Sequence, residues 1–126
     1  MPPINGILET PLYVDDPERS AKFYSDVFGF NKFSSGERLI AMKIADKQIL
    51  LLFKKGLSEH LPNLKHDGSG QSHMAFAIDA AQLTAWEQWL AQCGVAIEER
   101  KQWDRGGVSL YFRDPDGNKL NAFIMG

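Results

Sequence analysis

Residues 7 to 30, with the sequence ILETPLYVDDPERSAKFYSDVFGF, predict a β-strand that is followed directly by an α-helix. Side chains in a strand alternate between two faces, so Leu12 and Val14 share one face while Glu9 and Tyr13 share the other. The strand therefore separates an apolar face, which suits a core, from a face that carries an acidic side chain.

The helix begins at the sequence Asp15-Asp16-Pro17-Glu18. An aspartate side chain can accept hydrogen bonds from the free N–H groups of the first turn, and proline fits that turn. Glu18 interacts favourably with the positive end of the helix dipole, and Gly29 is suited to end the helix. Apolar residues recur between these limits at helical spacing: Ala21, Tyr24, Val27 and Phe28.

The order of elements in the first half returns in the second half. After the first helix, short strands are expected at about residues 31–35, 39–44 and 48–54. In the second half, Asp79 with Gln82 three residues later resembles a capping box, and Gly94 is expected to end the helix that follows. The remaining strands are expected at about residues 72–78, 95–102, 108–113 and 119–124.

Alignment of the two halves supports an internal duplication. The aligned pairs include Glu9 with His73, Leu12 with Phe76, Asp46 with Asp116 and Leu51 with Asn121. We therefore expect an α+β fold in which two βαβββ modules form a curled mixed sheet around a cavity, with the helices on the outer face. A single domain is expected over residues 1–126, with module one at about 1–55, a linker at about 56–70 and module two at about 71–126.

Composition argues against several kinds of partner. The net charge of −2 comes from scattered acids and bases without a basic stripe, so nucleic acid is not expected to bind. The longest apolar run, Ile49 to Phe53, is too short to span a bilayer, and the first residues lack a signal-peptide pattern, so we expect a cytoplasmic protein with no membrane contact. Cys93, the sole cysteine, follows the apolar spacing of its helix and is expected to be a buried thiol.

Glu9 and His73 occupy equivalent strands and lie on the faces opposite to the apolar ones. A sheet with helices on one side can curl its other side around a cavity, which would turn both side chains inward. A carboxylate and an imidazole in one cavity would suit a divalent metal ion.

Five segments carry a resemblance to a known family: LYVDDPERS at 12–20, FY at 23–24, VFGF at 27–30, SHMAFA at 72–77 and LYFRDPDGN at 110–118. Together they resemble the vicinal oxygen chelate superfamily, which includes glyoxalase I, fosfomycin- and bleomycin-resistance proteins and extradiol dioxygenases. The resemblance covers essentially the whole chain and implies the fold. It does not choose the reaction, because this fold hosts isomerases, transferases, dioxygenases and metal-free binding proteins.

The resemblance also implies a set of metal ligands. The first ligand falls on Glu9 and the second on His73, and both are acceptable chemically. The last ligand, normally a glutamate, falls on Asn121, whose neutral amide oxygen is a weaker ligand. The fourth position, used by glyoxalase I, falls on Leu51, which cannot bind metal, so glyoxalase I activity is disfavoured.

Other side chains are expected to shape a substrate pocket. Ser109, Tyr111 and Arg113 share one strand face, and Trp103 and Arg105 precede them in a loop whose Gly106 and Gly107 would permit a mobile cover. The alternative reading is that Trp103 and Tyr111 are core or interface aromatics and that Arg105 is solvated. His60 and His66, in the linker, are weak candidates for substitute ligands.

Two functions remain open. In the first, the chain is an enzyme, namely a metal-dependent lyase, isomerase, transferase or dioxygenase, and a divalent ion polarises vicinal oxygens of a small substrate. The ion would be Mn, Zn, Ni, Fe or Mg, which the sequence does not distinguish. In the second, the chain resembles bleomycin resistance proteins and sequesters a small molecule without metal. A homodimer is expected in either case, because the family usually completes its cavities by pairing βαβββ units.

Overall fold

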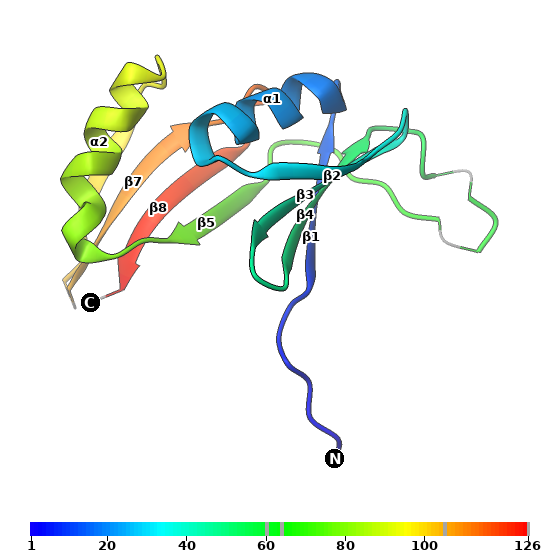
Figure 1. Ribbon diagram of the computed structural model, residues 1–126, viewed down its shortest axis with the longest axis horizontal. Helices are drawn as coiled ribbons and strands as arrows, with labels where there is room; N and C mark the ends of the chain where they lie inside the picture. Colours follow the sequence, from blue (N-terminus) through cyan, green and yellow to red (C-terminus); the bar gives the residue numbers. More distant parts are fainter. Residues whose placement is uncertain (60, 64, 105, 126) are drawn as a thin grey trace. The chain divides into compact units, whose positions relative to one another are not determined.

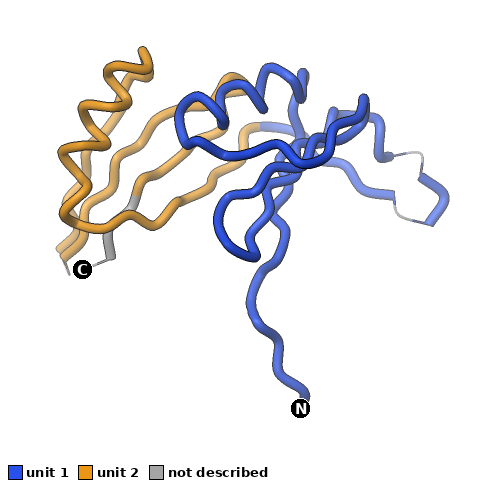
Figure 2. The backbone as a smooth tube through the Cα atoms, viewed as in Figure 1, with its two compact units in different colours: residues 1–70 blue, residues 71–126 orange. Residues whose placement is uncertain are grey.

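The computed structural model describes residues 1–59, 61–63, 65–104 and 106–125, and the chain divides into two compact units, Met1–Gly70 and Gln71–Gly126 (Figures 1 and 2). Each unit contains one βαβββ module with its own four-stranded mixed sheet. The predicted α+β fold with two such modules is therefore confirmed. Within the described ranges, no helix has the length and apolar character needed to cross a membrane.

The first unit follows the predicted order of elements. Its sheet has the strand order β1-β4-β3-β2, in which β1 runs parallel to β4 and the other neighbours are antiparallel. Its elements are β1 (Glu9–Val14), α1 (Pro17–Phe28), β2 (Asn31–Ser35), β3 (Leu39–Ala45) and β4 (Gln48–Lys54).

Helix α1 packs against β3 and β4 and covers one face of this sheet. Leu12 and Val14 are almost fully buried, at 2% and 0% exposure, and Leu52, the register partner of Leu12, is fully buried as well. Glu9 and Tyr13 fall on the opposite face, as the alternation predicts. Glu9 is therefore outside the core of its own unit.

Both ends of α1 have the predicted caps. The Asp16 carboxylate accepts hydrogen bonds from the backbone N–H groups of Glu18 at 3.1 Å and Arg19 at 3.3 Å. Gly29 ends the helix in the left-handed conformation, with φ of 73°, which glycine adopts without a Cβ clash.

The second unit repeats the topology, with the strand order β5-β8-β7-β6 and a parallel β5–β8 pair. The capping box expected at Asp79 is wrong, because its side chain makes no capping hydrogen bond. A single 3-10 turn, η1, comes first instead, and the Gln82 N–H donates to the Asp79 carbonyl at 2.9 Å. Its elements are β5 (His73–Ala77), η1 (Ala80–Gln82), α2 (Leu83–Gln92), β6 (Glu99–Gln102), β7 (Gly107–Arg113) and β8 (Lys119–Met125).

The two faces of the second sheet differ in character. Leu110, Phe112 and Leu120 are fully buried on one face. Leu90 is also fully buried on α2, whereas Cys93, just beyond the helix, is half-buried rather than buried as expected. The apolar face of this unit thus forms its core and leaves the other face for polar side chains.

Candidate functional site

The register of the second sheet brings several predicted site residues to one face. Asn121 pairs with Ala75 on one side and with Tyr111 on the other, while Lys119 pairs with both His73 and Arg113. Register partners point to the same side of a sheet, as do residues two apart along a strand. The face opposite to the apolar one, called here the polar face, therefore carries His73, Ser109, Tyr111, Arg113, Lys119 and Asn121.

A backbone contact selects the tautomer of the neutral His73 ring. Its Nδ1 lies 3.0 Å from the carbonyl oxygen of Lys119. Since a carbonyl oxygen only accepts hydrogen bonds, Nδ1 carries the proton, and the lone pair of the neutral ring is on Nε2. Metal-binding histidines are commonly oriented by the same kind of contact. The exposed His73 ring thus presents a nitrogen that can bind a cation.

Asn121 is the departure from the family pattern, and its environment is unusual. The residue is only 5% exposed, and its Oδ1 is buried without a hydrogen-bond partner among the described residues. Such an orphaned acceptor costs about 1–3 kcal/mol. A cation or a hydrogen-bond donor supplied from outside the described chain would relieve this cost. The donor set of the polar face, an imidazole nitrogen with an amide oxygen, therefore fits a divalent ion of nitrogen and oxygen preference.

The Tyr111 ring lies near two other side chains of the polar face, His73 and Lys119. Its ring centroid is 6.4 Å from that of His73, and the Lys119 Nζ lies 4.8 Å from its centroid. Sequence reasoning missed Lys119. The signal was present, because Lys119 precedes Asn121 by two residues and so must share its face if both are in one strand.

Trp103 is held against the polar face by a hydrogen bond. Its Nε1 donates to the Oγ of the fully buried Ser109 at 2.9 Å, and the Lys101 Nζ lies 4.1 Å from its ring centroid. Trp103 keeps 38% of its surface exposed. Trp103 is thus in direct contact with the strand that carries Ser109.

Of the two arginines predicted for the pocket, Arg113 is engaged by groups of its own unit. The Arg113 Nε donates to the Glu98 carboxylate, at 3.0 and 3.1 Å, and its Nη1 donates to the Gly117 carbonyl at 2.9 Å. These contacts join β7 to the turn before β8, so the guanidinium has a structural task. Arg105 lies outside the described residues.

In the first unit, Glu9 is exposed at the start of β1. Leu51 shares its face, because Glu9 pairs with Ile49 and Pro11 with Leu51. His66 is in a structural role, since its Nδ1 is 2.8 Å from the Tyr13 Oη and its ring packs edge-on against Phe53. His60 lies outside the described residues.

Acidic, histidine and cysteine side chains could together form a ready-made metal cluster. In the part of the chain that the structure describes, three or more His, Cys, Asp or Glu side chains do not gather anywhere that could hold a metal ion. On the polar face that carries His73, the amide oxygen of Asn121 is a buried acceptor without a partner among the described residues.

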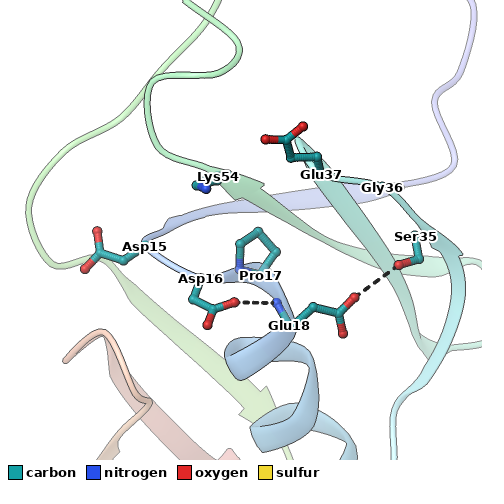
Figure 3. A pocket seen from close by; sticks show the side chains of 8 residues that line it. All are labelled: Asp15, Asp16, Pro17, Glu18, Ser35, Gly36, Glu37 and Lys54. Carbon is teal, nitrogen blue, oxygen red and sulfur yellow. Dashed lines mark hydrogen bonds between the residues drawn. The ribbon is translucent and has the colours of Figure 1, made fainter.

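The first unit also contains a pocket that the sequence did not predict. It has a volume of about 460 Å³ and lies where α1 begins, beside the turn between β2 and β3 (Figure 3). The Glu18 carboxylate in it accepts a hydrogen bond from the Ser35 Oγ at 3.3 Å and pairs with Lys32 at 3.3 Å. Its lining residues are Asp15, Asp16, Pro17, Glu18, Ser35, Gly36, Glu37 and Lys54.

Comparison with known proteins identifies relatives over most of the chain. Residues 6–122 match the family model described as the Glyoxalase/Bleomycin resistance protein/Dioxygenase superfamily. Metallothiol transferase FosB of Shouchella clausii is 29% identical, over 94% of this chain and 80% of that protein. Metallothiol transferase FosB of Staphylococcus epidermidis is 31% identical, over 85% and 72% respectively. The crystal structure of lactoylglutathione lyase from Agrobacterium tumefaciens superposes with a TM-score of 0.89 and 32% identity, over 98% of this chain and 96% of that one.

Proposed function

Since this chain belongs to the glyoxalase, bleomycin resistance protein and dioxygenase superfamily, we propose that it is a transferase that acts on a small molecule with the help of a divalent metal ion. The names of the two FosB relatives favour a transferase. The observation that carries the proposal is on the polar face of the second unit, where Nε2 of His73 has its lone pair available and Oδ1 of Asn121 is buried without a partner.

His73 and Asn121 would hold the metal on the polar face of the second unit. Glu9 belongs to the first unit and stays a prediction from the family pattern. When bound, such an ion acts as a Lewis acid toward substrate oxygens. The Lys119 carbonyl keeps Nδ1 of His73 protonated and thereby keeps Nε2 free for the ion. Tyr111 and Trp103 would form the aromatic walls that exclude water from the substrate.

A lyase activity like that named for the Agrobacterium structure is less well supported. The residue that the family pattern gives to the fourth ligand of glyoxalase I is Leu51 here, and its side chain offers no donor atom. Asn121 likewise offers a neutral oxygen in place of a carboxylate. We therefore do not assign glyoxalase I activity to this chain.

Metal-free binding of a small molecule is the second candidate function. It is favoured by the neutral Asn121 and by the cation Lys119 on the same face, since both weaken the attraction for a second cation. In this case a donor group of the ligand would satisfy the orphaned Oδ1 of Asn121.

The substitution Asn121→Glu separates the two candidates. If Asn121 contributes to a metal site, a carboxylate of nearly the same reach should tighten the binding of Mn²⁺, Zn²⁺ or Ni²⁺ about tenfold, or roughly 1.4 kcal/mol. Calorimetric titration of the parent, His73→Ala and Asn121→Glu proteins measures this effect. His73→Ala should abolish binding, and melting curves should show that metal stabilises Asn121→Glu more than the parent.

Gln88→Glu is the matched control, because it adds the same charge at an exposed position of α2. Its metal affinity should equal that of the parent. If Asn121→Glu gains neither affinity nor metal-dependent stability, the metal-site proposal fails and metal-free binding takes its place.

A further inference from the structure

Lys119 is a cation on the polar face whose charge the described residues leave unbalanced. We propose that Lys119 holds an anionic group of the substrate, a carboxylate or a phosphate-type group, beside His73. This inference rests on the proposed function, because it adds a substrate class to the same face.

The position of Lys119 ties it closely to the candidate metal ligands. It pairs in register with His73, and its backbone carbonyl contacts Nδ1 of that ring at 3.0 Å. Its Nζ lies 4.8 Å from the centroid of Tyr111, the register partner of Asn121. The amine therefore lies along the polar face, over the residue that pairs with Asn121.

The charges around Lys119 show why an anion fits there. Two other cations of the unit are neutralised, since Arg113 pairs with Glu98 at 3.0 Å and Arg100 lies 3.6 Å from Glu87. Lys119 forms no ion pair with a described residue, although it is half-buried, and its contact with Tyr111 is a cation–π interaction.

Two further charged side chains share this face. Lys101 lies over Trp103, and Glu99 is across Tyr111 from Asn121 in the register of the sheet. Glu99 is exposed on the edge strand β6, whereas Lys119 is in β8, between β5 and β7. An anion at Lys119 is thus separated from this carboxylate by the width of β7.

The chemistry of the neighbouring atoms defines the ligand more closely. The ammonium group of Lys119 offers hydrogen-bond donors and a positive charge, while the orphaned Oδ1 of Asn121 accepts only. A ligand that satisfies both carries an anionic group at one end and a hydroxyl or metal-bound oxygen near it. Small hydroxy acids and phosphate-type esters have this pattern.

Calorimetric titration with inorganic phosphate and with acetate tests the inference and distinguishes the two kinds of anion. Both probes are applied to the parent and to Lys119→Met, Lys119→Arg and Lys22→Met. The control, Lys22, is an exposed residue of α1 that pairs with Asp26, so its loss removes the same charge elsewhere. Loss of a charge-assisted contact should weaken the preferred anion about tenfold in Lys119→Met. Lys119→Arg should keep most of the affinity, and Lys22→Met all of it.

A parallel titration with Mn²⁺ separates this inference from the proposed function. Lys119→Met should bind Mn²⁺ at least as well as the parent, because a nearby positive charge is removed. If no protein binds Mn²⁺ but anion binding still depends on Lys119, the metal proposal fails and the anion site stands. If neither anion binds the parent, or if Lys119→Met binds it as well as the parent does, the inference is overturned.

Discussion

The two units share one topology but differ in how their helices are packed. Helix α1 buries five residues, including Pro17 and Tyr24, whereas Leu90 is the one buried residue of helix α2, which is described throughout. The first strand of each unit shows the same difference in burial. Leu12 and Val14 are buried in the first unit, while the aligned Phe76 and Ile78 remain partly exposed in the second.

The chemistry is distributed in the opposite way. The orphaned oxygen of Asn121 and the unbalanced charge of Lys119 both lie in the second unit. Such features cost stability and are retained in proteins where they serve binding or catalysis. In this duplicated module the first copy thus has the denser core, and the second carries the face that we propose for binding.

The largest expected effect of this difference is on the free energy of unfolding when an aromatic side chain of each helix is replaced by alanine. Tyr24 is fully buried, and its ring packs with Phe23, Phe28 and Phe30, so Tyr24→Ala should lower the free energy of unfolding by about 3–5 kcal/mol. The substitution Trp89→Ala, at a residue of α2 that is already 41% exposed, should cost less than Tyr24→Ala.

Urea denaturation followed by far-UV circular dichroism measures both changes. Fluorescence adds a local probe, because all three tryptophans are in the second unit. Equal costs for Tyr24→Ala and Trp89→Ala would contradict the proposed difference between the two helices.

Much of the fold could be predicted because it depends on local patterns. Alternation of side chains located the strands, helical spacing located α1 and α2, and the Asp16 cap is present as expected. The capping box predicted at Asp79 was wrong, because the sequence pattern considers only the side chains that could cap the helix. There, the Gln82 N–H that a capping side chain would bind donates to the Asp79 backbone carbonyl instead and closes a 3-10 turn.

The candidate site could be predicted only in part. Alternation correctly placed Ser109, Tyr111 and Arg113 on one face. The ion pair of Arg113 with Glu98 and the contact of Lys119 with His73 depend on the register between strands far apart in the sequence. Register is determined by packing of the whole sheet, so a local pattern does not contain it.

Substitutions at the starts of the two helices should change the free energy of unfolding less than the substitution of Tyr24 does. Asp16→Ala should cost about 1 kcal/mol, because two N–H groups at the start of α1 lose their acceptor. Asp79→Ala should change the free energy of unfolding by less than about 0.5 kcal/mol, since its side chain makes no cap. Thermal and urea unfolding of the two variants provide the test. A larger loss of free energy of unfolding in Asp79→Ala would mean that the Asp79 side chain stabilises the protein in a way other than helix capping.

The smallest effect is expected at the equivalent turns between the last two strands of each unit. Lys47, between β3 and β4, has a φ of 61°, and the aligned Gly117, between β7 and β8, has a φ of 77°. A non-glycine residue in this left-handed region costs roughly 1–2 kcal/mol, while glycine loses about 0.5–1 kcal/mol of extra entropy on folding. Lys47→Gly should therefore stabilise the first unit by about 0.5 kcal/mol.

Lys47→Ala is the control, because it removes the same charge but keeps the strained φ, and it should leave stability nearly unchanged. Urea unfolding midpoints at constant slope would resolve the two variants. If both variants gain the same free energy of unfolding, the gain comes from the lost charge. Gly117 would then not make its turn more stable than the turn at Lys47.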